Sequence, residues 1–142
     1  MGVEPHPGAD RLNWLLANFV RDTHGVRDAI AVSSDGLLVA TSAGLDRTEA
    51  DHLGAIVSGL TSLGRSAARR YAFEGFKLIM IEMRRGFLLV SQIEGGSCLG
   101  VLADARCDLG LIGYEIAVLA DRFGTILTPD LIAESRDALP LG

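Results

Sequence analysis

Three short apolar runs separated by turn residues occupy the middle of the chain, between residues 76 and 103. They read FKLIMIEM, FLLVSQI and SCLGVLA, and the breaks between them contain RRG at 84–86 and EGG at 94–96. Apolar, β-branched and aromatic residues between short Gly-containing breaks are typical of a strand meander. In the first run Leu78 and Ile79 point to opposite faces, so both faces of the predicted sheet are apolar. Such a sheet needs cover on both faces.

Apolar residues at helical spacing predict three helices around these strands. The first begins after Asp10 and ends at His24-Gly25. The second runs from about Arg47 to Tyr71, with Asp46 as its N-cap, and the third runs from about Asp104 to Phe123.

Two more strands, VRDAIAVSS and LLVATS, lie between the first two helices and flank SDG at 34–36. Asp-Gly between two apolar runs predicts a hairpin. The element order is therefore αββαβββα. It predicts an α+β fold, with a five-stranded, mostly antiparallel sheet between helices.

Composition and charge narrow the class of protein. The chain has 142 residues, of which 49% are hydrophobic, and a formal net charge of −5. We expect a flexible arm at 1–9, one domain at 10–125 and a tail at 126–142, in which Thr128 could cap a short helix. The acidic balance argues against a nucleic-acid partner. Without a signal-like segment or a long apolar run, we expect a cytoplasmic protein.

The long predicted helix carries small side chains at every fourth position. We expect its sheet-facing stripe to be Leu53, Ile56, Val57, Leu60 and Leu63. One helix is about 10 Å across, whereas five strands span roughly 20 Å, so a second copy of the helix would complete the cover. Self-association through the small residues and simple packing on the chain's own sheet both remain open. The small residues are Ala50, Gly54, Ser58, Ser62 and Ser66.

Residues able to carry chemistry do not assemble into a recognisable site in the sequence. His6, His24 and His52 lack partners at metal-ligand spacing. Cys107 lies near a predicted helix N-terminus, where a thiol pKa can fall, but small buried hydrophobes are the simpler interpretation of Cys98 and Cys107. No phosphate loop or nucleophile elbow occurs. We therefore expect no catalytic activity, no cofactor and no metal.

The chain resembles the Roadblock/dynein light chain superfamily, in its bacterial, conservon-type and MglB-like branch. The resemblance is carried by LNWLLANFV, by the run from GVRDAIAVSSDGLLVATS to SAARR, by IMIEM, and by GFLLVSQIEGGSCLGVLADARCDLGLIGYEI. These segments cover about residues 11–124, and SSDGLLVATS is the most specific of them.

The resemblance implies a Roadblock/profilin-like sandwich that forms a homodimer, in which the third strands pair and the long helices pack together. It implies a non-catalytic scaffold or regulator of a small Ras-like GTPase, beside a sensor-kinase-like protein, with recruitment to a membrane only through partners. We expect Arg69, Arg84 and Arg85 as candidate partner contacts. The expected homodimer interface comprises Gly54, Val57, Ser58, Thr61, Ser62, Arg65, Lys77, Ile79, Ile81 and Met83.

A small-molecule sensor is the alternative function. Helix–sheet–helix domains of this size can enclose a ligand, and such a site needs a polar group inside a cavity. Ser91 and Gln92 are the mid-strand polar residues that could supply it. A closed and wholly apolar interior would argue against this alternative.

Overall fold

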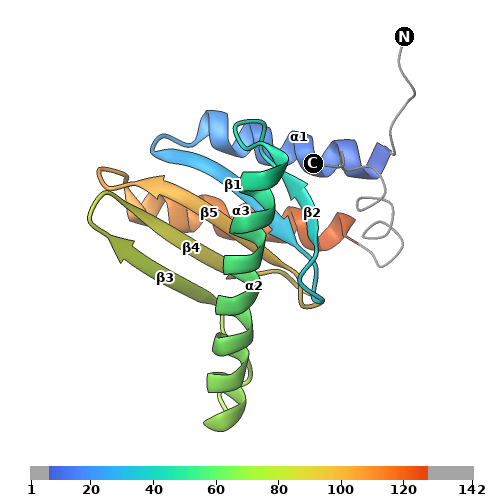
Figure 1. The fold of residues 1–142 in the computed structure, drawn as a ribbon, viewed down its shortest axis with the longest axis vertical. Helices are drawn as coiled ribbons and strands as arrows, with labels where there is room; N and C mark the ends of the chain where they lie inside the picture. Colours follow the sequence, from blue (N-terminus) through green and yellow to red (C-terminus); the bar gives the residue numbers. More distant parts are fainter. Residues whose placement is uncertain (1–6, 128–142) are drawn as a thin grey trace.

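Five antiparallel strands form a single sheet in the computed structural model, which describes residues 7–127 (Figure 1). The strands lie in the order β2-β1-β5-β4-β3. This arrangement confirms the α+β fold and the predicted order αββαβββα. The elements are α1 (Pro7–Asp22), β1 (Val26–Val32), β2 (Leu38–Thr41), α2 (Arg47–Arg70), β3 (Leu78–Met83), β4 (Gly86–Gln92), β5 (Cys98–Asp104) and α3 (Leu109–Ile126).

Helices cover the sheet on both faces, as the two apolar faces of its strands require. Alternate residues of β1 point to opposite layers: Ala29 joins the cluster under α1 and α3, whereas Ile30 joins the cluster under α2. In β4, Leu89 and Val90 divide in the same way. The first cluster is the larger, because two helices contribute to it and only α2 contributes to the second.

Side-chain caps set the starts of two helices. Asp46 accepts the backbone N–H of Glu49 at 2.8 Å, which confirms Asp46 as the N-cap of α2. Asp108 accepts the N–H of Leu111 at 3.1 Å, so α3 begins at Leu109 and not near Asp104 as predicted. The intervening residues extend β5 and form a turn.

Other boundaries also differ from the predictions. α1 begins at Pro7, before the predicted start after Asp10, and β3 begins at Leu78 although its apolar run starts at Phe76. α3 continues through Gly124 to Ile126, and Gly124 is not among the glycines with the positive φ that commonly ends a helix. The short helix considered at Thr128 lies outside the described residues.

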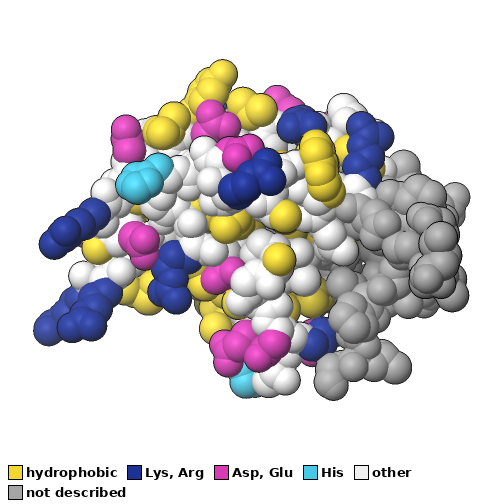
Figure 2. Space-filling view, turned by 90° about the horizontal axis from the view of Figure 1, so that it is seen from above, with side chains coloured by type: hydrophobic (Ala, Val, Ile, Leu, Met, Phe, Trp, Pro, Cys, Tyr) yellow, Lys and Arg dark blue, Asp and Glu magenta, His cyan; other side chains and the backbone are white. Residues whose placement is uncertain are grey.

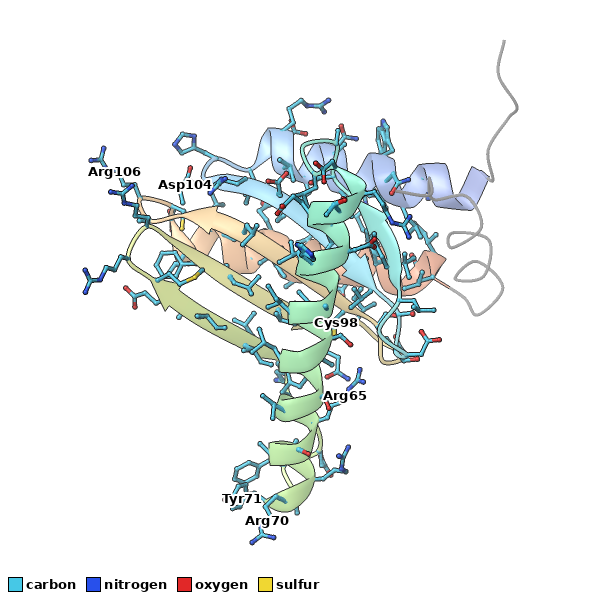
Figure 3. The ribbon with its side chains drawn as sticks, in the orientation of Figure 1. Arg65, Arg70, Tyr71, Cys98, Asp104 and Arg106 are labelled. Atoms are coloured by element: carbon cyan, nitrogen blue, oxygen red, sulfur yellow. The ribbon has the colours of Figure 1, made fainter. Side chains whose placement is uncertain are left out.

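α2 is longer than the sheet beneath it is wide. Its 24 residues extend about 36 Å, while five strands span roughly 20 Å. Its C-terminal turns therefore project beyond the sheet (Figure 1), and Arg70 and Tyr71 lie at the projecting end (Figure 3). Tyr71 is exposed, and the centroid of its ring lies 6.2 Å from that of Phe73.

Within residues 7–127, no helix combines the length and apolarity needed to cross a membrane.

The predicted sheet-facing stripe of α2 is only partly correct. Leu53 and Val57 are buried, but Ile56 is 52% exposed and Leu63 is 69% exposed. The helix rests on the sheet through smaller residues instead, and Gly100 on β5 permits the approach. A Cβ at Gly100 would lie 2.6 Å from Cγ2 of Val57. The buried residues of α2 are Ala50, Leu53, Gly54, Val57, Thr61 and Ala68.

Candidate interaction faces

α2 presents two different flanks on either side of its buried face. Each flank is a row with residues spaced by four, three and four positions, which keeps a row on one side of an α-helix. The two rows are offset by two residues, or about 200° around the helix axis. The apolar flank is Ile56, Leu60, Leu63 and Ala67, and the polar flank is Ser58, Ser62, Arg65 and Arg69.

The apolar flank lies on the side of α2 that faces β3. A Cβ built at Gly64 would lie 3.0 Å from Cδ1 of Ile79, so this glycine lets the helix approach the strand. Leu60 and Ile81 are partly buried against the cluster under α2. Further out, Leu63 remains exposed. An apolar surface thus continues from the core of the chain to its outside.

The two edge strands of the sheet, β2 and β3, differ in how open they are to pairing with another chain. β2 has four residues, and Oδ1 of Asn13 accepts the N–H of Thr41 at 3.0 Å, which occupies part of that edge. β3 has six residues and, among residues 7–127, pairs only with β4. Its side chains Leu78, Met80 and Met83 are each nearly half exposed. A long apolar edge strand of this kind is a template for pairing with another chain.

The polar flank of α2 lies against the β1–β2 and β4–β5 turns, at the end of the strands away from the β3–β4 turn. Ser58 adjoins the β1–β2 turn, where a Cβ at Gly36 (φ +85°) would lie 2.5 Å from Oγ of Ser58. Nη2 of Arg65 donates a hydrogen bond to the carbonyl of Gly96 in the β4–β5 turn. Arg65 lies beside the start of β5, close to Cys98 (Figure 3). This flank is therefore polar and anchored to two turns.

The residues predicted for one interface divide among three places. Gly54, Val57 and Thr61 are buried against the chain's own sheet and offer little surface to another subunit. Ser58, Ser62 and Arg65 lie on the polar flank, away from β3.

Ile79, Ile81 and Met83 lie on β3, and exposed Lys77 directly precedes that strand. Ile79 and Ile81 pack against the same cluster as Leu60 of α2. Ile56 and Leu63, which had been expected to pack on the sheet, are exposed on the flank of α2 that contains Leu60. The sequence signal that could have separated these residues is the spacing of two distinct rows along α2, one apolar and one polar.

The three arginines that are candidate partner contacts lie in two different elements. Arg69 is on the polar flank, whereas Arg84 and Arg85 form the exposed β3–β4 turn. Arg106 lies at the same end of the sheet as that turn (Figure 3), and basic side chains project there when the molecule is seen from above (Figure 2).

The cysteines are free thiols with raised pKa values. Burial raises the pKa of Cys98, although Oγ1 of Thr61 donates to its Sγ at 3.4 Å. Burial also raises the pKa of Cys107, so the fall considered for a helix N-terminus does not occur. Within residues 7–127, no cluster of histidine, cysteine or acidic residues could hold a metal ion. His24 and His52 are exposed, and His6 lies outside the described residues.

Comparison with known proteins identifies the class of protein that this fold and these faces define. The sequence model of the Roadblock/LC7 domain matches residues 12–103. The chain belongs to the Roadblock/LC7 family. No curated protein matches the chain.

Solved structures agree with this family. A Roadblock/LC7 domain from Streptomyces avermitilis is 37% identical, with a TM-score of 0.74 over 78% of this chain and 92% of that chain. Myxococcus xanthus MglB shares the fold at 18% identity, with a TM-score of 0.75 over 82% of this chain and 94% of that chain. An MglB with a tetrameric arrangement is 19% identical, with a TM-score of 0.72 over 96% of this chain and 100% of that chain.

Proposed function

We propose that this protein is a non-catalytic homodimer that acts as a scaffold or regulator of a small Ras-like GTPase. The observation that carries the proposal is the continuous apolar surface formed by the open edge of β3 and the apolar flank of α2. A second copy would pair its β3 with this edge and place its α2 beside the first. Exposed Ile56 and Leu63 would then be buried between the helices.

The proposed dimer differs in detail from the interface predicted from the sequence. Its contacts would come from Ile56, Leu60 and Leu63, together with Ile79, Ile81 and Met83. The polar flank would remain free. Association of two such dimers is a further proposal, supported by the tetrameric arrangement of the MglB relative.

Membership in the Roadblock/LC7 family supports the regulatory part of the proposal. The resemblance of the chain to the bacterial branch implies the GTPase partner, and a sensor-kinase-like protein in the same complex. Two paired α2 helices would present a symmetric platform. Arg84 and Arg85 at the β3–β4 turn are candidate contacts at its margin, where an arginine can bind phosphate oxygens.

The test has two stages. Light scattering on the purified chain should give the mass of a dimer or of a multiple of it, and a monomer would overturn the proposal. A purified bacterial Ras-like GTPase, of the class that the resemblance implies, is then loaded with GDP or a non-hydrolysable GTP analogue and titrated by calorimetry. Nucleotide-dependent binding is the expected result, and the rate of GTP hydrolysis separates an activator from a scaffold. A dimer that binds the GTPase in neither state would contradict the regulatory role.

A further inference from the structure

α3 carries large apolar side chains on its outward face as well as on the face that packs on the sheet. Leu111, Tyr114 and Val118 are all exposed. An outer helix of a globular domain is normally polar on its outward face, and a helix that is apolar all round is normally covered on both sides. We therefore expect a further layer over this helix. The face that α3 already buries consists of Ile112, Ile116, Leu119 and Phe123.

α1 extends this exposed surface, because it lies beside α3 on the face of the sheet opposite α2 (Figure 1). The two helices run in opposite directions: a Cβ at Gly25, just after α1, would lie 2.6 Å from Cβ of Cys107, just before α3. A groove of about 250 Å³ lies between them. Trp14 is exposed on α1, four positions before Asn18, which lines the groove. The exposed apolar residues of this α1–α3 face are Trp14, Leu111, Tyr114 and Val118.

The charges of the α1–α3 face are arranged so that two copies of it would complement each other. Glu115 and Arg122 both line the groove, and within residues 7–127 neither forms an ion pair. They are seven positions apart on α3, so they lie on the same side of the helix and about 10 Å from each other. Asp22, which also lines the groove, is already paired with Arg21.

A two-fold axis close to Val118 would bring these opposite charges together. In an antiparallel pair of α3 helices about that axis, Glu115 would face the partner's Arg122, and Arg122 would face the partner's Glu115. Val118 would meet its own counterpart at the centre. An acidic and a basic position placed evenly about one point is the pattern that a contact between two identical surfaces requires.

We propose that the α1–α3 face binds a second copy of the chain, with α3 packed antiparallel on the partner's α3. The contact lies on the opposite side of the sheet from α2, so it can form together with the proposed β3–α2 dimer. Two such dimers joined in this way make a tetramer. This contact would supply the surface through which the dimers associate, and to that extent it rests on the proposed function.

Light scattering of the full-length protein across a range of concentrations measures the assembly. The wild type should have the mass of a tetramer at high concentration and half that mass on dilution. Val118→Arg should stay at half the wild-type mass, because two arginines would meet at the two-fold axis. Leu37→Arg is the matched control, since it makes the same kind of change at an exposed residue of the β1–β2 turn. This control should keep the wild-type mass.

The variant Ile56→Arg with Leu63→Arg separates the α3 contact from the β3–α2 dimer. With only the α3 contact left, it should form dimers at high concentration, and adding Val118→Arg should leave monomers. A wild-type dimer that is split by Val118→Arg alone would support the α3 contact and contradict the β3–α2 dimer. An unchanged mass in Val118→Arg would overturn the α3 contact without touching the proposed function, and would leave the tail at 128–142 or a different protein to cover this face.

A charge exchange tests the antiparallel pairing. Glu115→Arg and Arg122→Glu should each weaken association through α3 by about tenfold, because each variant places like charges opposite each other twice. An equal mixture of the two variants should regain the wild-type mass, since a chain with two arginines then faces a chain with two glutamates. Neither position is buried, so each variant should keep the wild-type circular dichroism spectrum. A mixture that associates no better than its components would overturn the proposed pairing.

Discussion

Asn13 on α1 is joined to Thr41 on β2: the side-chain Oδ1 of Asn13 accepts the backbone N–H of Thr41 at 3.0 Å. The bond connects a helix to the outer edge of the shortest strand, and it satisfies a backbone donor that would otherwise be open to pairing. β3 has no such contact within the described residues. The fold thus blocks part of the β2 edge and leaves the β3 edge available for pairing with another chain.

Replacing Asn13 by Ala should lower the free energy of unfolding by about 1 kcal/mol, because the N–H of Thr41 loses its acceptor. Urea denaturation of the two proteins measures the difference. Asn18→Ala is the matched control, since Asn18 lies on the same helix and is half-buried. An equal loss in both variants would show that the Asn13–Thr41 bond is not the cause.

The double variant Ile56→Arg with Leu63→Arg should convert a wild-type dimer to a monomer. Two arginines on the apolar flank would place like charges between the proposed paired helices, where burial of an unpaired charge is costly. Light scattering across a range of concentrations measures the mass. Both sites are exposed in the single chain, so we expect the circular dichroism spectrum to stay unchanged.

The control for this prediction is Ser58→Arg with Ser62→Arg, which adds the same charge to the polar flank. We expect this variant to keep the wild-type mass. If it became a monomer while the apolar-flank variant remained a dimer, the interface would lie on the opposite side of α2.

Gly59→Ala and Gly64→Ala should differ in stability although both remove a glycine from α2. A Cβ at Gly59 meets no other atom within 4 Å, so Gly59→Ala should raise the free energy of unfolding by about 1 kcal/mol through helix propensity. A Cβ at Gly64 would lie 2.9 Å from Cδ1 of Phe76, so Gly64→Ala should lose that gain. Thermal unfolding compares them, and identical melting temperatures would contradict the packing of α2 on the start of β3.

Stability should decline in alkaline solution because of Cys98. Burial raises the pKa of this thiol above its ordinary value of 9.0, so the folded state retains the proton more strongly than the unfolded state. The free energy of unfolding should be constant below about pH 8 and should fall as the pH rises through the ordinary thiol pKa. Denaturation at a series of pH values tests this for wild type and Cys98→Ala. An equally steep decline in the variant would assign the effect to other groups.

The pattern of apolar residues determined the elements and their order. Alternation in the three central runs predicted the meander, and Asp-Gly at 35–36 predicted the hairpin between β1 and β2. Asp46 was recognisable as a helix cap because capping acts over only three residues. These features depend on local geometry, so neighbouring residues in the chain are sufficient to specify them.

Tertiary structure decided which side of α2 packs on the sheet. The sequence offered a large apolar stripe and a small-residue stripe, and spacing alone could not show which of them the sheet would accept. Gly100 on β5 accommodates Val57, and this rotates Ile56 and Leu63 outward. The same rotation places Arg65 beside Gly96 in the β4–β5 turn. Both candidate faces therefore depend on contacts between residues far apart in the chain, which local spacing does not encode.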